Sequence, residues 1–196
     1  AVNTIVNREG RLFGFNTDGP GFVAALRNEA AFDPAGRRCL LLGAGGAARG
    51  IAFALADARA AKVAIWNRSS ERAVRLANDV NAGGATLEAV ASASPTGYEL
   101  VVNCTSLGMH GTGTEDALPC EPGQAAAGAL FVDIVYAPED TAWLRAARAA
   151  GVRTLGGLPM LIYQGALAFE LWTGVHAPVE TMFAAARKAL AARGAP

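Results

Sequence analysis

A glycine-rich turn is the segment whose residue types most clearly suit a chemical task. Residues 43–48 read Gly-Ala-Gly-Gly-Ala-Ala; they follow the apolar run 39–42 and open an alanine-rich stretch. Glycine at 43 permits a tight turn, glycine at 45 leaves room beside the backbone, and Ala48 lets the next helix pack closely. A helix N-terminus at this place offers N–H groups and partial positive charge to phosphate. The spacing predicts a dinucleotide site, with a ligand-free turn as the alternative. The site residues are Gly43, Ala44, Gly45, Gly46 and Ala47.

The polar segment after the second expected strand bears on which dinucleotide would bind. No Asp or Glu stands at the end of strand 62–66 to hold a free ribose 2′-hydroxyl. The residues that follow are Asn67, Arg68, Ser69 and Arg72. The two arginines lie four apart on an expected helical turn and can face one spot, where guanidinium groups suit a phosphate. We therefore expect NADP rather than NAD; the alternative is a solvated basic helix start paired with a neighbouring glutamate.

Strands and helices alternate along most of the chain. The expected strands are 38–42, 62–66, 86–90 (a weak strand or a helix), 100–103, 129–135 and 152–155. The expected helices run from Thr17 or Asp18 to about 27, from the glycine turn to about 58, and over 70–80, 141–150, 158–172 and 179–192. Strands 1–7 and 11–15 form a hairpin, and 108–128 is a loop. This order predicts an α/β, Rossmann-like, doubly wound and mostly parallel sheet with helices on both faces, and a ligand at the carboxyl ends of its strands.

Composition narrows the partners and the compartment. The 17 basic and 17 acidic residues balance, which gives no reason to expect nucleic acid or an anionic membrane as partner. The three cysteines show no CxxC spacing and favour a reducing cytoplasm. The apolar stretch 158–172 contains Gln164 and Glu170 and is too short to span a bilayer. His110 and His176 are each isolated, so no metal site is expected.

Seven short segments stand in one order across nearly the whole chain. They are 1–4 (AVNT), 16–19 (NTDG), 43–47 (GAGGA), 67–69 (NRS), 103–109 (NCTSLGM), 133–136 (DIVY) and 156–166 (GGLPMLIYQGA). Together they resemble the shikimate dehydrogenase family, for which the NTDG and GLPMLxxQ signatures are specific. The resemblance implies NADP-dependent reduction of 3-dehydroshikimate to shikimate in aromatic amino-acid (chorismate) biosynthesis.

The resemblance also assigns roles by position. Asn3 and Asp18 would bind substrate hydroxyls, and Asp18 would be the acid/base partner of a lysine in the family's N-terminal domain. Tyr136 and Gln164 would contact the substrate from the cofactor side. The residues that would line the nicotinamide and ribose are Thr105, Ile134, Gly157 and Met160. Without the resemblance, Asp18 reads as a helix cap and Tyr136 as a surface aromatic, whereas Gln164 on an apolar helix needs a polar partner.

The same resemblance divides the chain into three parts. Residues 1–17 would end a substrate domain and form a linking hairpin, and 18–173 would be the NADP-binding Rossmann domain. Residues 174–196 would form a helix that packs back toward the substrate domain. Because the family's lysine is absent and the sequence begins in strand pattern, we expect a fragment that binds NADP(H), is inactive alone, and is a monomer or homodimer.

Three other readings remain open. One is a quinate/shikimate dehydrogenase paralogue. Another is a non-catalytic NADP(H)-sensing domain, which would have no need of the substrate-side residues. A third is a related NADP oxidoreductase, such as glutamyl-tRNA reductase or a methylene-tetrahydrofolate dehydrogenase, which the NTDG segment disfavours.

Overall fold

A six-stranded sheet forms the centre of the molecule. The computed structural model describes residues 2–193. Residue 1 of the predicted hairpin segment 1–7 and residues 194–196 of the predicted C-terminal part 174–196 lie outside the described residues. The strands are β3 (Arg38–Leu42), β4 (Lys62–Trp66), β5 (Leu87–Ala89), β6 (Leu100–Asn103), β7 (Leu130–Asp133) and β8 (Arg153–Leu155). Their spatial order is β5-β4-β3-β6-β7-β8, and every neighbouring pair is parallel. Numbered from β3, this is the 3-2-1-4-5-6 order of a Rossmann fold. The predicted fold class is confirmed.

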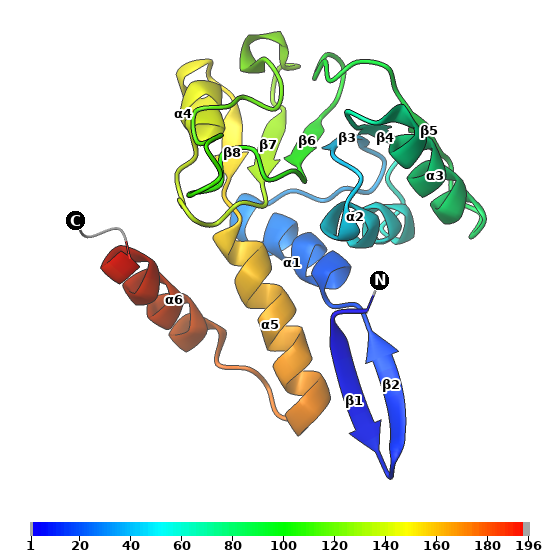
Figure 1. Cartoon of the computed structure of the whole chain (residues 1–196), viewed down its shortest axis with the longest axis vertical. Coiled ribbons are helices and arrows are strands. Elements are labelled where there is room, and N and C mark those ends of the chain that lie inside the picture. The colour runs from blue at the N-terminus through cyan, green and yellow to red at the C-terminus, as the bar shows by residue number, and fades with distance from the viewer. Residues whose placement is uncertain (1, 194–196) are drawn as a thin grey trace.

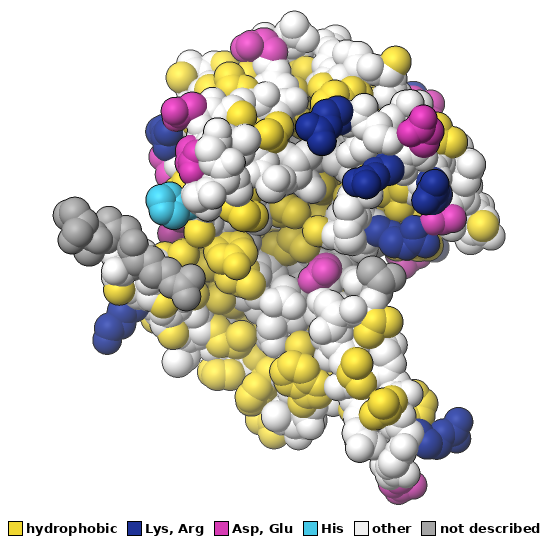
Figure 2. All heavy atoms as spheres, viewed as in Figure 1, with side chains coloured by type: hydrophobic (Ala, Val, Ile, Leu, Met, Phe, Trp, Pro, Cys, Tyr) yellow, Lys and Arg dark blue, Asp and Glu magenta, His cyan; other side chains and the backbone are white. Residues whose placement is uncertain are grey.

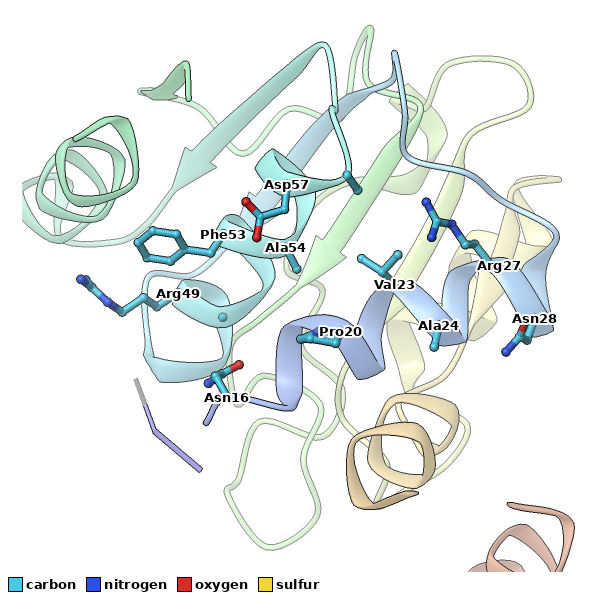
Figure 3. Close-up of a pocket in the computed structure, with 12 residues that line it drawn as sticks. Asn16, Pro20, Val23, Ala24, Arg27, Asn28, Arg49, Phe53, Ala54 and Asp57 are labelled. Carbon is cyan, nitrogen blue, oxygen red and sulfur yellow. The ribbon is translucent and has the colours of Figure 1, made fainter. Parts of the chain in front are cut away.

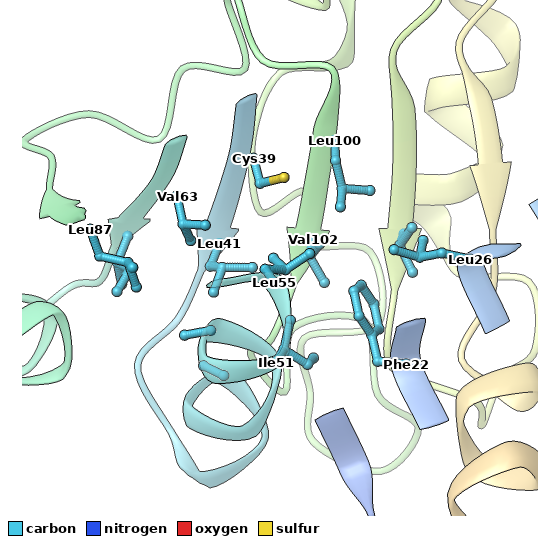
Figure 4. Close-up of a cluster of buried hydrophobic side chains, with 14 of the residues drawn as sticks. Phe22, Leu26, Cys39, Leu41, Ile51, Leu55, Val63, Leu87, Leu100 and Val102 are labelled. Carbon is cyan, nitrogen blue, oxygen red and sulfur yellow. The ribbon is translucent and has the colours of Figure 1, made fainter. Parts of the chain in front are cut away.

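The strands are apolar throughout because both faces of the sheet are covered. In β3, the side chains of Leu40, Leu41 and Leu42 are all fully buried. Successive side chains of a strand point to opposite faces, so Leu41 belongs to one hydrophobic cluster and its two neighbours to another. Figure 4 shows the first cluster, where Phe22 and Ile51 from two helices meet Leu41 and Val102 from the sheet.

Helices cover the two faces unequally. The first cluster receives side chains from four helices: α1 (Asp18–Ala30), α2 (Gly46–Asp57), α3 (Ser70–Asn81) and α5 (Leu158–Thr173). The other face is covered by α4 (Ala142–Ala149) and by part of the long irregular segment before β7. Trp143 of α4 stacks on Phe131 at 4.9 Å and donates a hydrogen bond to the Cys120 carbonyl. The segment predicted as loop 108–128 thus covers the core and contains a short 3-10 helix, η1 (Pro122–Gln124).

Two appendages extend from this body (Figure 1). A hairpin of β1 (Thr4–Arg8) and β2 (Arg11–Phe15) turns at Glu9 and Gly10, both at positive φ. It is tied to α5 by a hydrogen bond from Trp172 Nε1 to the Ile5 carbonyl. The last helix, α6 (Val179–Arg193), lies against α5, where Phe183 meets Tyr163 edge-on. Within residues 2–193, no helix is both long and apolar enough to cross a membrane.

The structure corrects several expected boundaries. Segment 86–90, left open between strand and helix, contains strand β5, and α1 continues three residues beyond Arg27. Thr17 occupies the N-cap position of α1, but its side chain makes no capping hydrogen bond. Helix α3 begins at Ser70 with Ser69 as its N-cap, so Arg68 precedes the helix. The expected i, i+4 helical pairing of Arg68 with Arg72 is therefore wrong.

Candidate functional site

The glycine turn joins β3 to α2 at the carboxyl edge of the sheet. Gly43 adopts φ +116°, and a Cβ there would lie 2.9 Å from the Cys104 carbonyl oxygen, so glycine is required. A Cβ at Gly45 or Gly46 would meet nothing within 4 Å. Helix α2 has no acidic residue in its first turn and no side-chain cap, which leaves its first N–H groups available. The turn can therefore hold an anion.

A cavity of about 320 Å³ opens beside this turn. Its lining consists of Ala44, Gly45, Gly46, Arg49, Arg72, Arg75, Leu76 and Asp79. Arg72 is one of these lining residues, whereas Arg68 is not. Arg49 and Arg75 were missed by the sequence reasoning, although Arg75 stands one helical turn after Arg72. Figure 2 shows basic side chains gathered over α2 and α3 on this side of the molecule.

The segment between β4 and α3 is organised by its own side chains. Asn67 Nδ2 donates to the Ser69 carbonyl at 2.9 Å, which shapes the turn that leads into α3. The Ser69 hydroxyl donates to Glu71 Oε2 at 2.9 Å. A phosphate at Ser69 would compete with this carboxylate. Asn67 thus has a structural role that the sequence reasoning did not foresee.

A second polar group lies where the hairpin, α1 and α5 meet. Asn3 Nδ2 donates to Asp18 Oδ1 at 2.8 Å and to Thr17 Oγ1 at 2.9 Å. The Thr17 hydroxyl lies 3.4 Å from Gln164 Oε1, and the Thr17 amide donates to Asn3 Oδ1 at 2.9 Å. Three residues predicted for substrate binding are therefore neighbours. Thr17 joins them and was considered only as a helix cap.

Backbone contacts between helices bring this group together. A Cβ on Gly21 would lie 2.6 Å from the Gln164 amide nitrogen, so α1 crosses α5 without an intervening side chain. A Cβ on Gly19 would lie 2.6 Å from the Gly50 carbonyl oxygen, so α1 touches α2 in the same way. Both glycines belong to the segment that starts with Asp18. They hold the first turn of α1 close to α5 and to Gly50 of α2.

A buried polar network closes the ends of β6 and β7. Asn103 and Asp133 are paired in the sheet, and Asn103 Nδ2 donates to Asp133 Oδ1 at 2.9 Å. The carboxylate also accepts from the Val135 amide at 3.0 Å and from the Thr141 hydroxyl at 2.8 Å. Asn103 Oδ1 accepts from the amide and the hydroxyl of Thr105. Burial raises the pKa of Asp133, although these hydrogen bonds oppose the shift. The network fixes Thr105 and the start of 134–136; the sequence reasoning gave neither Asn103 nor Asp133 a role.

The remaining predicted residues lie near this edge but play unequal parts. A Cβ on Gly157 would overlap the Ile134 carbonyl, so the start of α5 requires glycine. Met160 is largely buried in the core cluster, and Ile134 packs against it. Tyr136 is 39% exposed. Within residues 2–193, no hydrogen bond joins its hydroxyl to the Asn3 group.

Neither histidine belongs to the Asn3 group or to the network of Asn103 and Asp133. His110 is exposed in the loop after β6, and its amide donates to the Ala137 carbonyl. His176 lies between α5 and α6, and its ring is 3.2 Å from the Glu170 carboxylate. The expectation that His176 is isolated is therefore wrong. No group of three His, Cys, Asp or Glu side chains in the described part of the chain could hold a metal ion.

A groove of about 720 Å³ also runs between α1 and α2 (Figure 3). Asn16 and Arg49 lie toward one end, and Arg27 and Asn28 lie at the other. None of the predicted substrate or cofactor residues lines it. Arg49, however, lines both this groove and the cavity beside the glycine turn, so the two adjoin each other.

Comparison with known proteins matches this arrangement to one family. The family model for shikimate / quinate 5-dehydrogenase covers residues 26–142. The chain belongs to this family. A second model, for the shikimate 5′-dehydrogenase C-terminal domain, covers residues 157–187. The predicted family is confirmed.

Relatives in this shikimate/quinate dehydrogenase family cover nearly the whole chain. It is 46% identical to the shikimate dehydrogenase (NADP(+)) of Moorella thermoacetica, over 98% of this chain and 66% of that protein. It is also 46% identical to an enzyme of that name from Thermus thermophilus, over 97% of this chain and 68% of that protein. The chain thus spans about two thirds of the length of these curated relatives.

Solved structures of several dehydrogenases share the fold. A Thermus thermophilus shikimate 5-dehydrogenase, in complex with NADP(H) and shikimate, aligns with TM-score 0.83 and 42% identity, over 96% of this chain and 68% of that one. A 5-ketofructose reductase of Gluconobacter sp. strain CHM43 aligns with TM-score 0.87 and 39% identity, and a Corynebacterium glutamicum quinate dehydrogenase in complex with NAD with 0.86 and 30%. Each of these two alignments covers 96% of this chain and 68% of the other.

Proposed function

We propose that this chain supplies the NADP(H) site and part of the substrate site of a shikimate dehydrogenase. The observation that carries the proposal is the anion-accepting turn at Gly43–Gly46 beside the arginine-lined cavity. Arg72 and Arg75 have no carboxylate within ion-pair distance among residues 2–193. The turn would hold the pyrophosphate, and the cavity suits a 2′-phosphate. Named shikimate dehydrogenases (NADP(+)) at 46% identity support NADP as the cofactor.

The residues expected at the nicotinamide end lie across the same edge of the sheet. Thr105 is fixed by Asn103, and Ile134 by its contact with Gly157. When bound, NADPH would supply the hydride that reduces a ketone to an alcohol. The protein must hold the nicotinamide ring and the ketone close together in the correct orientation. The hydrogen bonds that fix Thr105 to Asn103 suit this task.

The substrate side of the site would be the group formed by Asn3, Asp18 and Gln164. Amide and carboxylate groups suit the hydroxyls of a cyclic polyol. A ketone that gains a hydride needs a proton at its oxygen, and a lysine paired with Asp18 could deliver it. The two lysines of this sequence cannot take this role readily: Lys62 opens β4 at the opposite edge of the sheet and pairs with Glu88 at 2.6 Å, and Lys188 lies in α6. The donor would lie in the part of the relatives that this chain does not span.

An exposed apolar face suits contact with that part. Val2, Ile5 and Leu12 on the hairpin and Trp172 at the end of α5 are each at least 58% exposed. We propose that residues 1–17 pack against a substrate domain, that 18–173 form the cofactor domain, and that 174–196 contribute a helix to the same contact. We also place the protein in the cytoplasm, as a monomer or homodimer.

Calorimetry with NADP⁺ and NAD⁺ tests the cofactor proposal on the chain as given. We expect NADP⁺ to bind and NAD⁺ to bind more weakly. Oxidation of shikimate with NADP⁺ tests the activity, and we expect little turnover by this chain alone. Failure to bind either dinucleotide would overturn the proposal.

Quinate is the second candidate substrate, because a quinate dehydrogenase shares the fold at 30% identity. A 5-ketofructose reductase shares it at 39% identity, which adds a ketose to the substrates to be tested. Rates with shikimate, quinate and 5-ketofructose, measured on the protein with its substrate domain, separate these candidates. If the protein binds NADP(H) but turns over none of these three substrates, the result would favour the non-catalytic NADP(H)-sensing domain.

A further inference from the structure

The arginine-lined cavity contains two cationic side chains, Arg49 and Arg75, besides the Arg72 expected from the segment after β4. Arg75 lies three residues after Arg72 on α3, and residues three apart share a helix face. Both arginines line the cavity together with Ala44, Gly45 and Gly46 of the anion-accepting turn. Arg75 therefore stands near the place expected for the ribose phosphate.

Charge balance in this cavity distinguishes its three arginines. Arg49 Nη1 lies 2.6 Å from Asp79 Oδ2, so its charge is paired within the protein. Among residues 2–193, neither Arg72 nor Arg75 has an ion-pair partner. Like charges three apart on a helix repel each other slightly. A doubly charged phosphate between the two would remove that repulsion and gain charge-assisted hydrogen bonds.

We propose that Arg75 is a specificity residue for the 2′-phosphate of NADP(H), acting as a pair with Arg72. This inference rests on the proposed cofactor function and adds a residue to it. Arg68 does not line the cavity, so the structure forms the cationic pair on one face of α3. Asp79, already engaged with Arg49, keeps the cavity from becoming still more cationic.

The test compares Arg75→Ala with the wild-type chain, using 2′,5′-ADP and 5′-AMP as probes in calorimetry. The two probes differ only in the 2′-phosphate. Loss of charge-assisted hydrogen bonds weakens binding by about 10- to 100-fold. We expect a loss of at least tenfold for 2′,5′-ADP, about twofold or less for 5′-AMP, and a shallower dependence of 2′,5′-ADP binding on salt.

Arg145→Ala is the matched control, because Arg145 lies on α4, on the other face of the sheet, beside Asp140. It removes the same charge without touching the cavity, and we expect no change with either probe. Circular dichroism and thermal midpoints establish that both variants fold.

The outcomes separate two failures. If the wild-type chain binds NADP⁺ but Arg75→Ala matches Arg145→Ala with both probes, the role of Arg75 is wrong and the cofactor proposal stands. An equal loss for 2′,5′-ADP and 5′-AMP would also overturn it, because Arg75 would then serve the shared phosphate or the fold. If the wild-type chain binds neither NADP⁺ nor 2′,5′-ADP, the cofactor proposal itself fails.

Discussion

Replacing Asp133 by alanine should destabilise the protein, because this carboxylate accepts hydrogen bonds from three groups. Its donors are Asn103 Nδ2, the Val135 amide and the Thr141 hydroxyl, at 2.9, 3.0 and 2.8 Å. Asn103, Asp133 and Thr141 are all fully buried, so water cannot replace the lost partner without rearrangement. The alanine variant would therefore leave donors without an acceptor inside the protein.

The magnitude follows from the groups that lose their acceptor. An unsatisfied buried donor costs about 1–3 kcal/mol. Asn103 keeps a bond to the Leu107 carbonyl and the Thr141 hydroxyl can rotate, so the Val135 amide is affected most. Removing a buried carboxylate also returns part of its desolvation cost. Because the lost hydrogen bonds outweigh the returned desolvation cost, we expect the free energy of unfolding to fall by about 2–4 kcal/mol. The thermal midpoint should be lower by roughly 5–12 °C.

Asparagine at position 133 provides the informative comparison. Its oxygen can still accept from Asn103 and Val135, and its amide can donate to the Thr141 oxygen. We expect Asp133→Asn to lower the free energy of unfolding by less than half as much as Asp133→Ala does. Glu139→Ala is the control, because Glu139 is exposed in the same segment; it should stay within about 0.5 kcal/mol of wild type.

The pH dependence has a definite sign. Burial raises the pKa of Asp133 in the folded protein above its usual value of 3.8. Below 3.8 the residue is protonated in both states, and as pH rises toward the raised pKa the unfolded state ionises first and is favoured. The stability of wild type relative to Asp133→Asn should therefore fall across that window and level off above it.

Urea unfolding followed by circular dichroism, repeated from about pH 3 to pH 8, measures these differences. NADPH fluorescence adds a second readout, because the network also positions Thr105. We expect Asp133→Ala to weaken NADPH binding more than 2′,5′-ADP binding. An alanine variant within about 0.5 kcal/mol of wild type at neutral pH would refute the reasoning from unsatisfied donors.

Three further predictions concern packing, hydrogen bonding and thiol reactivity. Gly21→Ala places a methyl group 2.6 Å from the backbone of α5 and should lower the free energy of unfolding by about 1–3 kcal/mol; an unchanged thermal midpoint would contradict direct helix contact. Thr17→Val removes the hydroxyl that accepts from Asn3 at 2.9 Å, so it should cost about 1–2 kcal/mol in urea unfolding, whereas Thr17→Ser should cost less; equal losses would point to lost packing instead. Burial raises the pKa of Cys39 and Cys120 to about 12, so neither should react with Ellman's reagent at about pH 8 until urea unfolds the chain; prompt labelling of either in the native protein would show that it is accessible.

The sequence was sufficient for features that depend on local pattern. Strand β3 and the turn at Gly43 were predicted because a doubly buried strand reads as an unbroken apolar run and its glycine turn has a fixed spacing. Helix α3 begins at Ser70, as the expected range 70–80 had it, and ends one residue later than expected. The error was to count Arg68 as part of its opening turn, because local propensity rarely resolves the residues that flank a helix start.

The residues that sequence reasoning missed depend on contacts between distant segments. Thr17 joins Asn3 to Gln164 only because α1 crosses α5 at a glycine. Arg49 faces Asp79 because α2 and α3 lie side by side. Neither relation has a period in the sequence that could reveal it.

By itself, the sequence determined the order of strands and helices, the anion-accepting turn and the family resemblance, because each is written in short stretches of chain. The tertiary structure decided which cations share the cavity, how Asn103 and Asp133 meet across β6 and β7, and how Thr17 comes to face Gln164. Strand register and the depth of a helix crossing are set by the packing of the whole core. A buried polar group gains its partner only when that packing places one within hydrogen-bond distance.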